Sequence, residues 1–133
     1  MNSRKRILII HTGGTLGMNL SGSPDDAENF KKSLKQYAPR MFELADVSLE
    51  ILLNKDSSNM SPRDWITIAR RLHERMDEWD GFVVTHGTDT LAFTASALRL
   101  SWEYASSVGG RPMFDGVGPV GASSNPRTTN PPP

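Results

Sequence analysis

The sequence of 133 residues contains no cysteine, and this absence excludes several kinds of site. Disulfides, thiolate nucleophiles and zinc–thiolate centres all require cysteine. The three histidines lie far apart without the short spacing of metal ligands, so we expect no metal site. Lysine and arginine together number 15, as do aspartate and glutamate, and the resulting net charge of zero gives no basic patch for nucleic acid.

Long apolar runs are also missing. After the basic residues Arg4 to Arg6, only four apolar residues precede His11, which is too few for the apolar region of a signal peptide. No stretch of the chain is long and apolar enough to cross a membrane. We therefore expect a cytoplasmic protein with no membrane partner, and the length is sufficient for one domain with a hydrophobic core.

Apolar periodicity predicts an alternation of strands and helices. Short runs of branched or aromatic residues indicate buried strands, and apolar residues at helical spacing indicate amphipathic helices. The expected strands are 5–10, 47–53 and 82–85, and the expected helices are 27–37, 62 to about 78, and 91 to about 102. This order is typical of a parallel sheet with helical crossovers, so the predicted fold class is α/β, a three-layer Rossmann-like domain.

Local signals mark the ends of the expected helices. Asp25 or Asp26 is expected to cap the first helix, with Phe30, Leu34 and Tyr37 on its apolar face, and Pro39 is expected to end it. Ser61-Pro62-Arg63-Asp64 is a strong start for the second helix, with a hydroxyl cap, proline at the first helical position and an acid in the first turn.

The composition changes near the end of the third expected helix. Residues from Gly109 to Pro133 contain five glycines and six of the nine prolines, and their few apolar residues show no periodicity. Such a segment buries too little surface to offset its ordering entropy. We therefore expect an α/β domain over 1–104 and a disordered, Gly/Pro-rich tail over 105–133.

Three loops are rich in glycine, hydroxyl and carboxylate groups, and each follows an expected strand. They are 12–17, 56–59 and 86–90. Because the carboxyl ends of parallel strands lie along the same edge of a sheet, we expect these loops to line one crevice. Turns commonly use the same residue types, so an ordinary role in turns and helix caps stays open for each loop taken alone.

The chemistry of this crevice centres on a threonine. Thr15 follows Gly13-Gly14, and a threonine hydroxyl is a weak nucleophile that needs a base and donors for the oxyanion. Backbone N–H groups near the glycines and near Gly87-Thr88 are candidate donors. A zwitterionic substrate would present an ammonium to a carboxylate such as Asp89, and a carboxylate to hydroxyl and N–H groups such as those of the Asp56-Ser57-Ser58 turn.

Other glycine-loop functions fit poorly. Gly13 to Gly17 lacks the lysine of a phosphate-binding P-loop and the spacing of a dinucleotide-binding motif, and the nearest acid after the second strand, Asp56, lies too far along the chain for ribose binding. His86 follows an apolar strand, and we expect it to be a hydrogen-bonded structural group rather than a base. Trp65 and Trp79 fall on an apolar helix stripe and are expected in the core.

Two of these loops carry recognisable motifs. Thr12-Gly13-Gly14-Thr15-Leu16-Gly17 resembles the first signature of the bacterial-type L-asparaginase family, and His86-Gly87-Thr88-Asp89-Thr90 resembles the second. Asp56-Ser57-Ser58-Asn59-Met60 resembles the substrate loop between them. The resemblance runs from about Ile7 to Leu98 and is closer to the cytoplasmic, type I branch. It implies an N-terminal asparaginase domain that hydrolyses L-asparagine to L-aspartate and ammonia without a cofactor, in homo-oligomers (dimers or tetramers).

The resemblance also assigns roles to single residues. Thr15 matches the threonine nucleophile that forms the acyl-enzyme, and Thr88 matches the second catalytic threonine, which also contacts substrate. Asp89 matches the carboxylate that holds the substrate ammonium. Ser57, with Asp56 and Ser58, matches the loop that holds the substrate carboxylate.

The sequence departs from the family pattern in three respects. Residues 18–30 contain no tyrosine to help activate the nucleophile, no lysine follows Lys55 to partner Thr88, and the similarity stops after Leu98. We therefore expect an incomplete asparaginase that lacks part of the family's catalytic machinery. Two alternatives remain, a related amidotransferase subunit, which would need an additional N-terminal domain, and a non-catalytic amino-acid-binding fragment.

Overall fold

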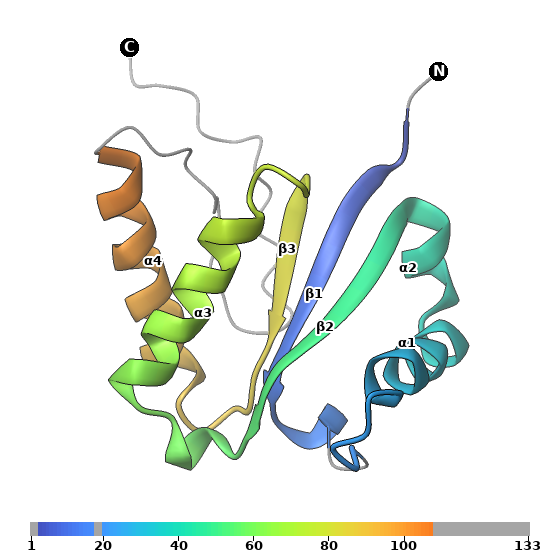
Figure 1. Cartoon of the computed structure of the whole chain (residues 1–133), viewed down its shortest axis with the longest axis horizontal. Coiled ribbons are helices and arrows are strands. Elements are labelled where there is room, and N and C mark those ends of the chain that lie inside the picture. Colours follow the sequence, from blue (N-terminus) through green and yellow to red (C-terminus); the bar gives the residue numbers. More distant parts are fainter. Residues whose placement is uncertain (1–2, 18–19, 108–133) are drawn as a thin grey trace.

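Three parallel strands form a single sheet in the computed structural model, which describes residues 3–17 and 20–107. The strands are β1 (Lys5–Gly13), β2 (Ala45–Lys55) and β3 (Gly81–Thr85), in the order β2-β1-β3 with β1 in the centre (Figure 1). The predicted α/β class and parallel sheet are confirmed. The expected tail falls mostly at 108–133, outside the described residues.

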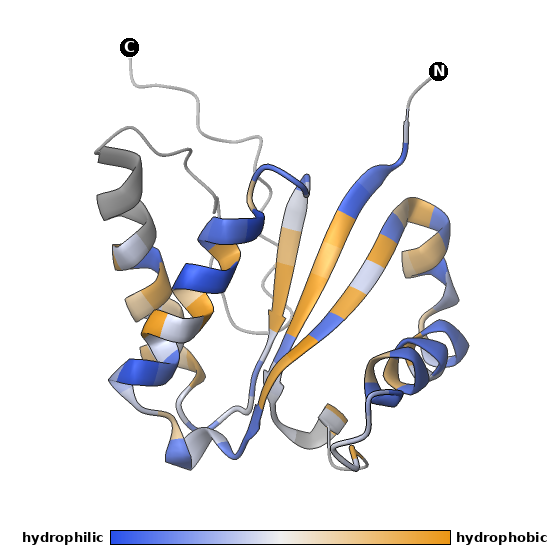
Figure 2. Cartoon of the chain, in the orientation of Figure 1, coloured by the Kyte–Doolittle hydropathy of each residue, from blue (hydrophilic) through white to orange (hydrophobic). Residues whose placement is uncertain are grey.

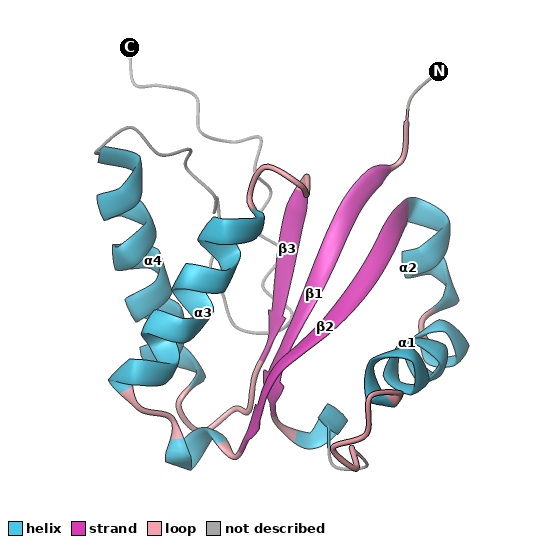
Figure 3. Ribbon diagram, viewed as in Figure 1, coloured by secondary structure: helices cyan, strands magenta, loops and turns pink. Residues whose placement is uncertain are grey.

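Helices cover both faces of the sheet. α1 (Asp26–Tyr37) and α2 (Pro39–Leu44) lie on one face, and α3 (Pro62–Arg75) and α4 (Leu91–Ser107) lie on the other (Figure 3). The short 3₁₀ turns η1 (Thr15–Gly17) and η2 (Ser57–Asn59) follow β1 and β2. The three-layer arrangement expected from the sequence is therefore present.

The face under α3 and α4 carries the larger apolar core. Alternate residues of β1 pack here against residues of both helices. Figure 2 shows that the strands are largely apolar and that α3 alternates between apolar and polar residues. The buried members are Leu8, Ile10, Ile68, Leu72 and Leu98. Each such side chain contributes about 1.5–3 kcal/mol by leaving water. The Trp79 ring packs against this cluster, as expected.

The opposite face is covered unevenly. Ile9, Val47 and Phe30 are buried there, because α1 and α2 lie over β2. Val83 of β3 pairs in register with Ile9, yet its side chain is 47% exposed. The described helices of this face therefore leave the β3 side of the sheet open.

The start of α3 matches its sequence signal. The Asp64 carboxylate accepts hydrogen bonds from Ser61 N and Ser61 Oγ at 2.9 and 3.1 Å, and Pro62 is the first helical residue. Lys55 Nζ lies 3.0 Å from both oxygens of Asp64. Burial alone would raise the pKa of Asp64, but the bonds from Ser61 and Lys55 outweigh it and hold the pKa below its ordinary value.

The first helix has its expected bounds to within one residue, but its cap and its apolar face differ from the expectation. α1 begins at Asp26 with Asp25 at the N-cap position, but the Asp25 side chain makes no capping hydrogen bond. The Asp26 carboxylate instead accepts bonds from Ser21 and Gly22 and closes the preceding loop. Tyr37 is 84% exposed rather than on the buried face. Pro39 follows the end of α1 but also begins α2, a position where its fixed φ suits a helix.

Candidate active site

The three loops expected to share an edge do lie together. A cavity of about 420 Å³ is lined by parts of all three: Gly14, Gly17, Asn54, Lys55, Asp56, Ser57, Gly87, Thr88 and Asp89. β1 is the central strand, with β2 on one side of it and β3 on the other, and the loops that line the cavity follow these three strands (Figure 1). Ligands of open α/β sheets bind at such a switch point, outside the carboxyl ends of the strands.

Two glycines let the loops touch through their backbones. Gly13 has φ +146°, and a Cβ placed on it would lie 1.9 Å from the carbonyl oxygen of Lys55. Gly14 has φ +94°, and its Cβ would lie 3.0 Å from the nitrogen of Gly87. Both angles favour glycine, and no side chain fits at the first position. The glycines therefore fix how closely the second and third loops approach the first.

Ser57 joins the second loop to the third. Its side chain is buried, and its Oγ accepts the Asp89 N–H at 3.1 Å. Its carbonyl accepts the Thr90 hydroxyl at 2.7 Å. Because Oγ acts as the acceptor toward Asp89, its own hydrogen remains to donate. The predicted site residues Ser57 and Asp89 are thus in direct contact.

Thr88 and Asp89 are both exposed and line the cavity just before α4. The peptide N–H groups at the start of this 17-residue helix favour negative charge. Asp89 and Thr88 bring a carboxyl group and a hydroxyl to the same wall of the cavity. These two predicted residues are placed together by the loop that follows β3.

The remaining members of the predicted carboxylate-binding turn bond to each other. The Asp56 carboxylate accepts Ser58 N at 2.9 Å and Ser58 Oγ at 2.8 Å, and these bonds lower the pKa of Asp56. Asp56 thereby caps η2 while still lining the cavity. Ser58 is not among the residues that line the cavity, so its hydroxyl stabilises the turn rather than facing this space.

Thr12 and Thr15 lie on either side of the glycine pair. Thr12 was expected in the loop 12–17, but it belongs to β1, and its fully buried hydroxyl donates to the Thr85 carbonyl at 2.6 Å. Thr12 therefore ties β1 to β3. The backbone of Thr15 begins η1 directly after Gly14, and its side chain lies outside the described part of the structure.

His86 has hydrogen-bond partners on both ring nitrogens. Its Nε2 lies 2.8 Å from Thr94 Oγ1, which in turn accepts the Trp65 indole N–H at 2.8 Å. The Thr94 hydroxyl hydrogen is thus directed to Nε2, and Nδ1 carries the proton that it donates to Gly87 O. This network fits the expected structural role of His86, and it gives Trp65 a polar function that its place on an apolar helix stripe did not indicate.

Three more residues near the cavity were not expected as site residues. Asn54 and Lys55 line it, and the imidazole of His11 is buried directly beneath η1. The first two lie between the predicted strand 47–53 and the predicted loop 56–59, which was the available signal in the sequence, and the structure places both at the end of β2. His11 ends an apolar run and offered no such signal, because a buried histidine is usual at that type of position.

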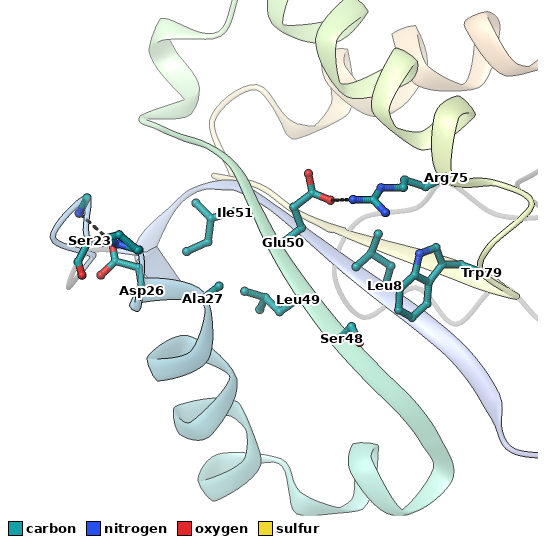
Figure 4. Close-up of a pocket in the computed structure, with 12 residues that line it drawn as sticks. Leu8, Ser23, Asp26, Ala27, Ser48, Leu49, Glu50, Ile51, Arg75 and Trp79 are labelled. Atoms are coloured by element: carbon teal, nitrogen blue, oxygen red, sulfur yellow. Dashed lines mark hydrogen bonds and ion pairs between the residues drawn. The ribbon is translucent and has the colours of Figure 1, made fainter.

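A larger hollow of about 560 Å³ lies beside β2 (Figure 4). Glu50 forms ion pairs there with Arg71 at 2.7 Å and with Arg75 at 3.6 Å. None of the predicted site residues lines this hollow. Glu50 is thus compensated by arginines, and Asp26, which also lines the hollow, already bonds Ser21 and Gly22. The site residues predicted from the sequence lie instead at the carboxyl ends of the strands.

Two kinds of feature are absent from residues 3–17 and 20–107. No three His, Asp or Glu side chains there are grouped to hold a metal ion. No helix in these ranges has the length and apolar character required to cross a membrane.

Comparison with known proteins places this geometry in a family. The model of the N-terminal domain of asparaginases matches residues 6–108, which is most of the chain. The chain belongs to the asparaginase family. Its sequence is 40% identical to the L-asparaginase of Thermococcus kodakarensis over 100 residues and 38% identical to L-asparaginase 1 of Escherichia coli K12 over 106 residues.

The asparaginase matches cover only part of each relative. They span 70% and 75% of this chain but 29% and 31% of the Thermococcus and Escherichia proteins. A probable cytoplasmic L-asparaginase from Campylobacter jejuni has the same fold, with a TM-score of 0.61 and 36% identity over 73% of this chain and 29% of that one. One subunit of the glutamyl-tRNA(Gln) amidotransferase from Archaeoglobus fulgidus is 33% identical over 94 residues, or 69% of this chain and 22% of its own length.

Proposed function

We propose that this asparaginase-family domain binds L-asparagine at the carboxyl edge of its sheet and hydrolyses it to L-aspartate and ammonia. The observation that carries the proposal is the hydrogen bond from Asp89 N to Ser57 Oγ, which brings both residues together at the wall of one polar cavity. One side of that contact supplies a hydroxyl donor for the substrate carboxylate. The other supplies a carboxylate for the substrate ammonium.

In the proposed reaction, the Thr15 hydroxyl attacks the carbonyl carbon of the side-chain amide. Its proton passes to the departing nitrogen, and ammonia leaves an acyl-enzyme ester on Thr15. Backbone N–H groups of the glycine loops stabilise the oxyanion that forms in this step. Water activated near Thr88 then cleaves the ester and releases L-aspartate.

Two observations bear on whether the chain turns over by itself. Lys55 is engaged with Asp64, and the sequence has no later lysine to partner Thr88. Tyr37 lies at the exposed end of α1, far along the helix from the loop that carries Thr15. Turnover by this chain alone is therefore expected to be slow. We further propose a cytoplasmic location and assembly into dimers or tetramers.

Ammonia release from L-asparagine by the purified chain tests the proposal. Thr15→Ala should reduce release by several orders of magnitude, because it removes the attacking oxygen. Thr67→Ala, an exposed threonine of α3, is the matched control and should leave release unchanged. Equal release from Thr15→Ala and the unchanged chain would refute the assigned nucleophile.

A non-catalytic role in amino-acid binding is the second candidate, favoured by the absence of a lysine partner. It predicts that the unchanged chain binds L-asparagine and L-aspartate without releasing ammonia. L-Glutamine in place of L-asparagine tests the side-chain length that the cavity accepts.

A further inference from the structure

A polar bridge beneath the first loop joins it to β2 and β3. We call His11, Asn54 and Gly17 the His11 bridge. His11 Nδ1 lies 2.7 Å from Thr85 Oγ1, and His11 Nε2 lies 3.3 Å from Asn54 Oδ1. Asn54 Nδ2 donates to the Gly17 carbonyl at 3.4 Å. One asparagine thus connects a buried ring of the central strand to the last residue of η1.

The bonding partners determine the protonation of the ring. A carbonyl oxygen can only accept, so the Asn54 NH₂ group must be the donor to Gly17 O. The Asn54 Oδ1 atom then faces His11. Nε2 must then carry the proton, and Nδ1 accepts the Thr85 hydroxyl. Burial lowers the pKa of His11 and outweighs the bond to Asn54, which acts in the opposite direction, and this favours the same neutral ring.

The bridge leaves no free space around Gly17. A Cβ on this residue would lie 2.2 Å from His11 Nε2 and 2.7 Å from Asn54 Oδ1. The Gly17 N–H also bonds the Gly14 carbonyl at 3.1 Å. The turn from Gly14 to Gly17, whose backbone includes Thr15, is therefore closed on itself and is attached to Asn54 at its Gly17 end.

We propose that Asn54 is a positioning residue that fixes the turn carrying Thr15, acting through His11 and Gly17. The role of Thr15 in this statement rests on the proposed function, whereas the bridge does not. Asn54 itself is exposed, although both groups that it bonds belong to buried residues. Its removal should therefore change the position of the turn without opening the core.

NMR on the full chain provides the test. Asn54→Ala removes both bonds, whereas Asn54→Asp keeps an acceptor for His11 and loses the donor to Gly17. The control is Asn59→Ala, at another exposed asparagine nearby. The ring ¹⁵N shifts of His11 report which nitrogen is protonated. Hydrogen exchange at the Gly17 amide and the chemical shift of the Thr15 amide report the turn.

We expect the unchanged chain to show an Nε2-protonated ring. Asn54→Ala should alter the ring shifts, move the Thr15 amide and speed Gly17 exchange about five-fold, which is the effect of one lost hydrogen bond. Asn54→Asp should speed exchange but retain the Nε2-protonated ring. If Asn54→Ala matches Asn59→Ala in all three measurements, the positioning role is wrong.

These measurements are independent of the proposed reaction. Failure of the unchanged chain to release ammonia or bind L-aspartate would count against the proposed function, while the ring shifts and exchange rates would still decide whether Asn54 fixes the turn. Where ammonia release is measurable, Asn54→Ala should lower kcat and leave KM unchanged, because Ser57 and Asp89 are intact.

Discussion

On the side of the sheet covered by α3 and α4, buried apolar side chains hold the elements together. At the carboxyl edge, the loops instead touch through backbone atoms of Gly13, Gly14 and Gly87 and through the hydroxyl of Ser57. Apolar burial is non-directional and supplies stability, whereas close backbone contacts and hydrogen bonds fix geometry. Stability and ligand binding should therefore respond to different substitutions.

The largest expected effect is on the stability of the apolar side. Ile68 is fully buried in α3, and Ile68→Ala should lower the free energy of unfolding by about 2–5 kcal/mol because it leaves a cavity. Ile66, in the same helix, is 56% exposed, and Ile66→Ala should change stability by no more than about 0.5 kcal/mol. Urea denaturation followed by tryptophan fluorescence measures both. Similar losses for the two variants would show that α3 does not pack as described.

Substitutions at the carboxyl edge are expected to reduce stability less than Ile68→Ala does, but to reduce ligand binding more. Gly14→Ala and Gly22→Ala both place a side chain at positive φ, which costs about 1–2 kcal/mol. A Cβ at position 22 meets open space, whereas one at position 14 lies 3.0 Å from Gly87 N. Gly14→Ala should therefore abolish L-aspartate binding and Gly22→Ala should preserve it, as measured by NMR titration. Binding by both variants would contradict the close loop packing.

Much of the fold, but less of the site, is predictable from the sequence. Apolar periodicity was enough to predict the strands, three of the helices and the shared edge, because buried faces impose a regular pattern. The Ser57–Asp89 bond and the His11 bridge depend on contacts between residues more than 30 positions apart, and no local pattern encodes them. The predicted bounds of α1 were right to within one residue, but the predicted side-chain cap was wrong, because the Asp26 carboxylate bonds the preceding loop rather than the start of the helix.

The smallest effect concerns pH. Burial lowers the pKa of His11 in the folded chain below its ordinary value of 6.5. At pH values between this lowered pKa and 6.5, the unfolded chain therefore binds more protons than the folded chain. Stability should therefore be retained above pH 6.5 and fall as the pH drops below it, by at most about 1.4 kcal/mol per pH unit. His11→Gln should remove this slope, and the exposed His73→Gln should keep it. Urea midpoints across this range measure the slope, and an unchanged slope in His11→Gln would contradict the neutral buried ring.

The most direct test of the central claim is an NMR titration of the full chain with L-aspartate, comparing the unchanged chain with Asp89→Asn and with Asp25→Asn, an exposed aspartate of another loop. The account predicts that the amides of Gly14, Ser57 and Asp89 shift together with one Kd, and that Asp89→Asn weakens this Kd about ten-fold or more while Asp25→Asn does not. Shifts confined to the hollow beside β2, at Glu50 and Arg75, or the same Kd for Asp89→Asn, would contradict an amino-acid site at the carboxyl edge of the sheet.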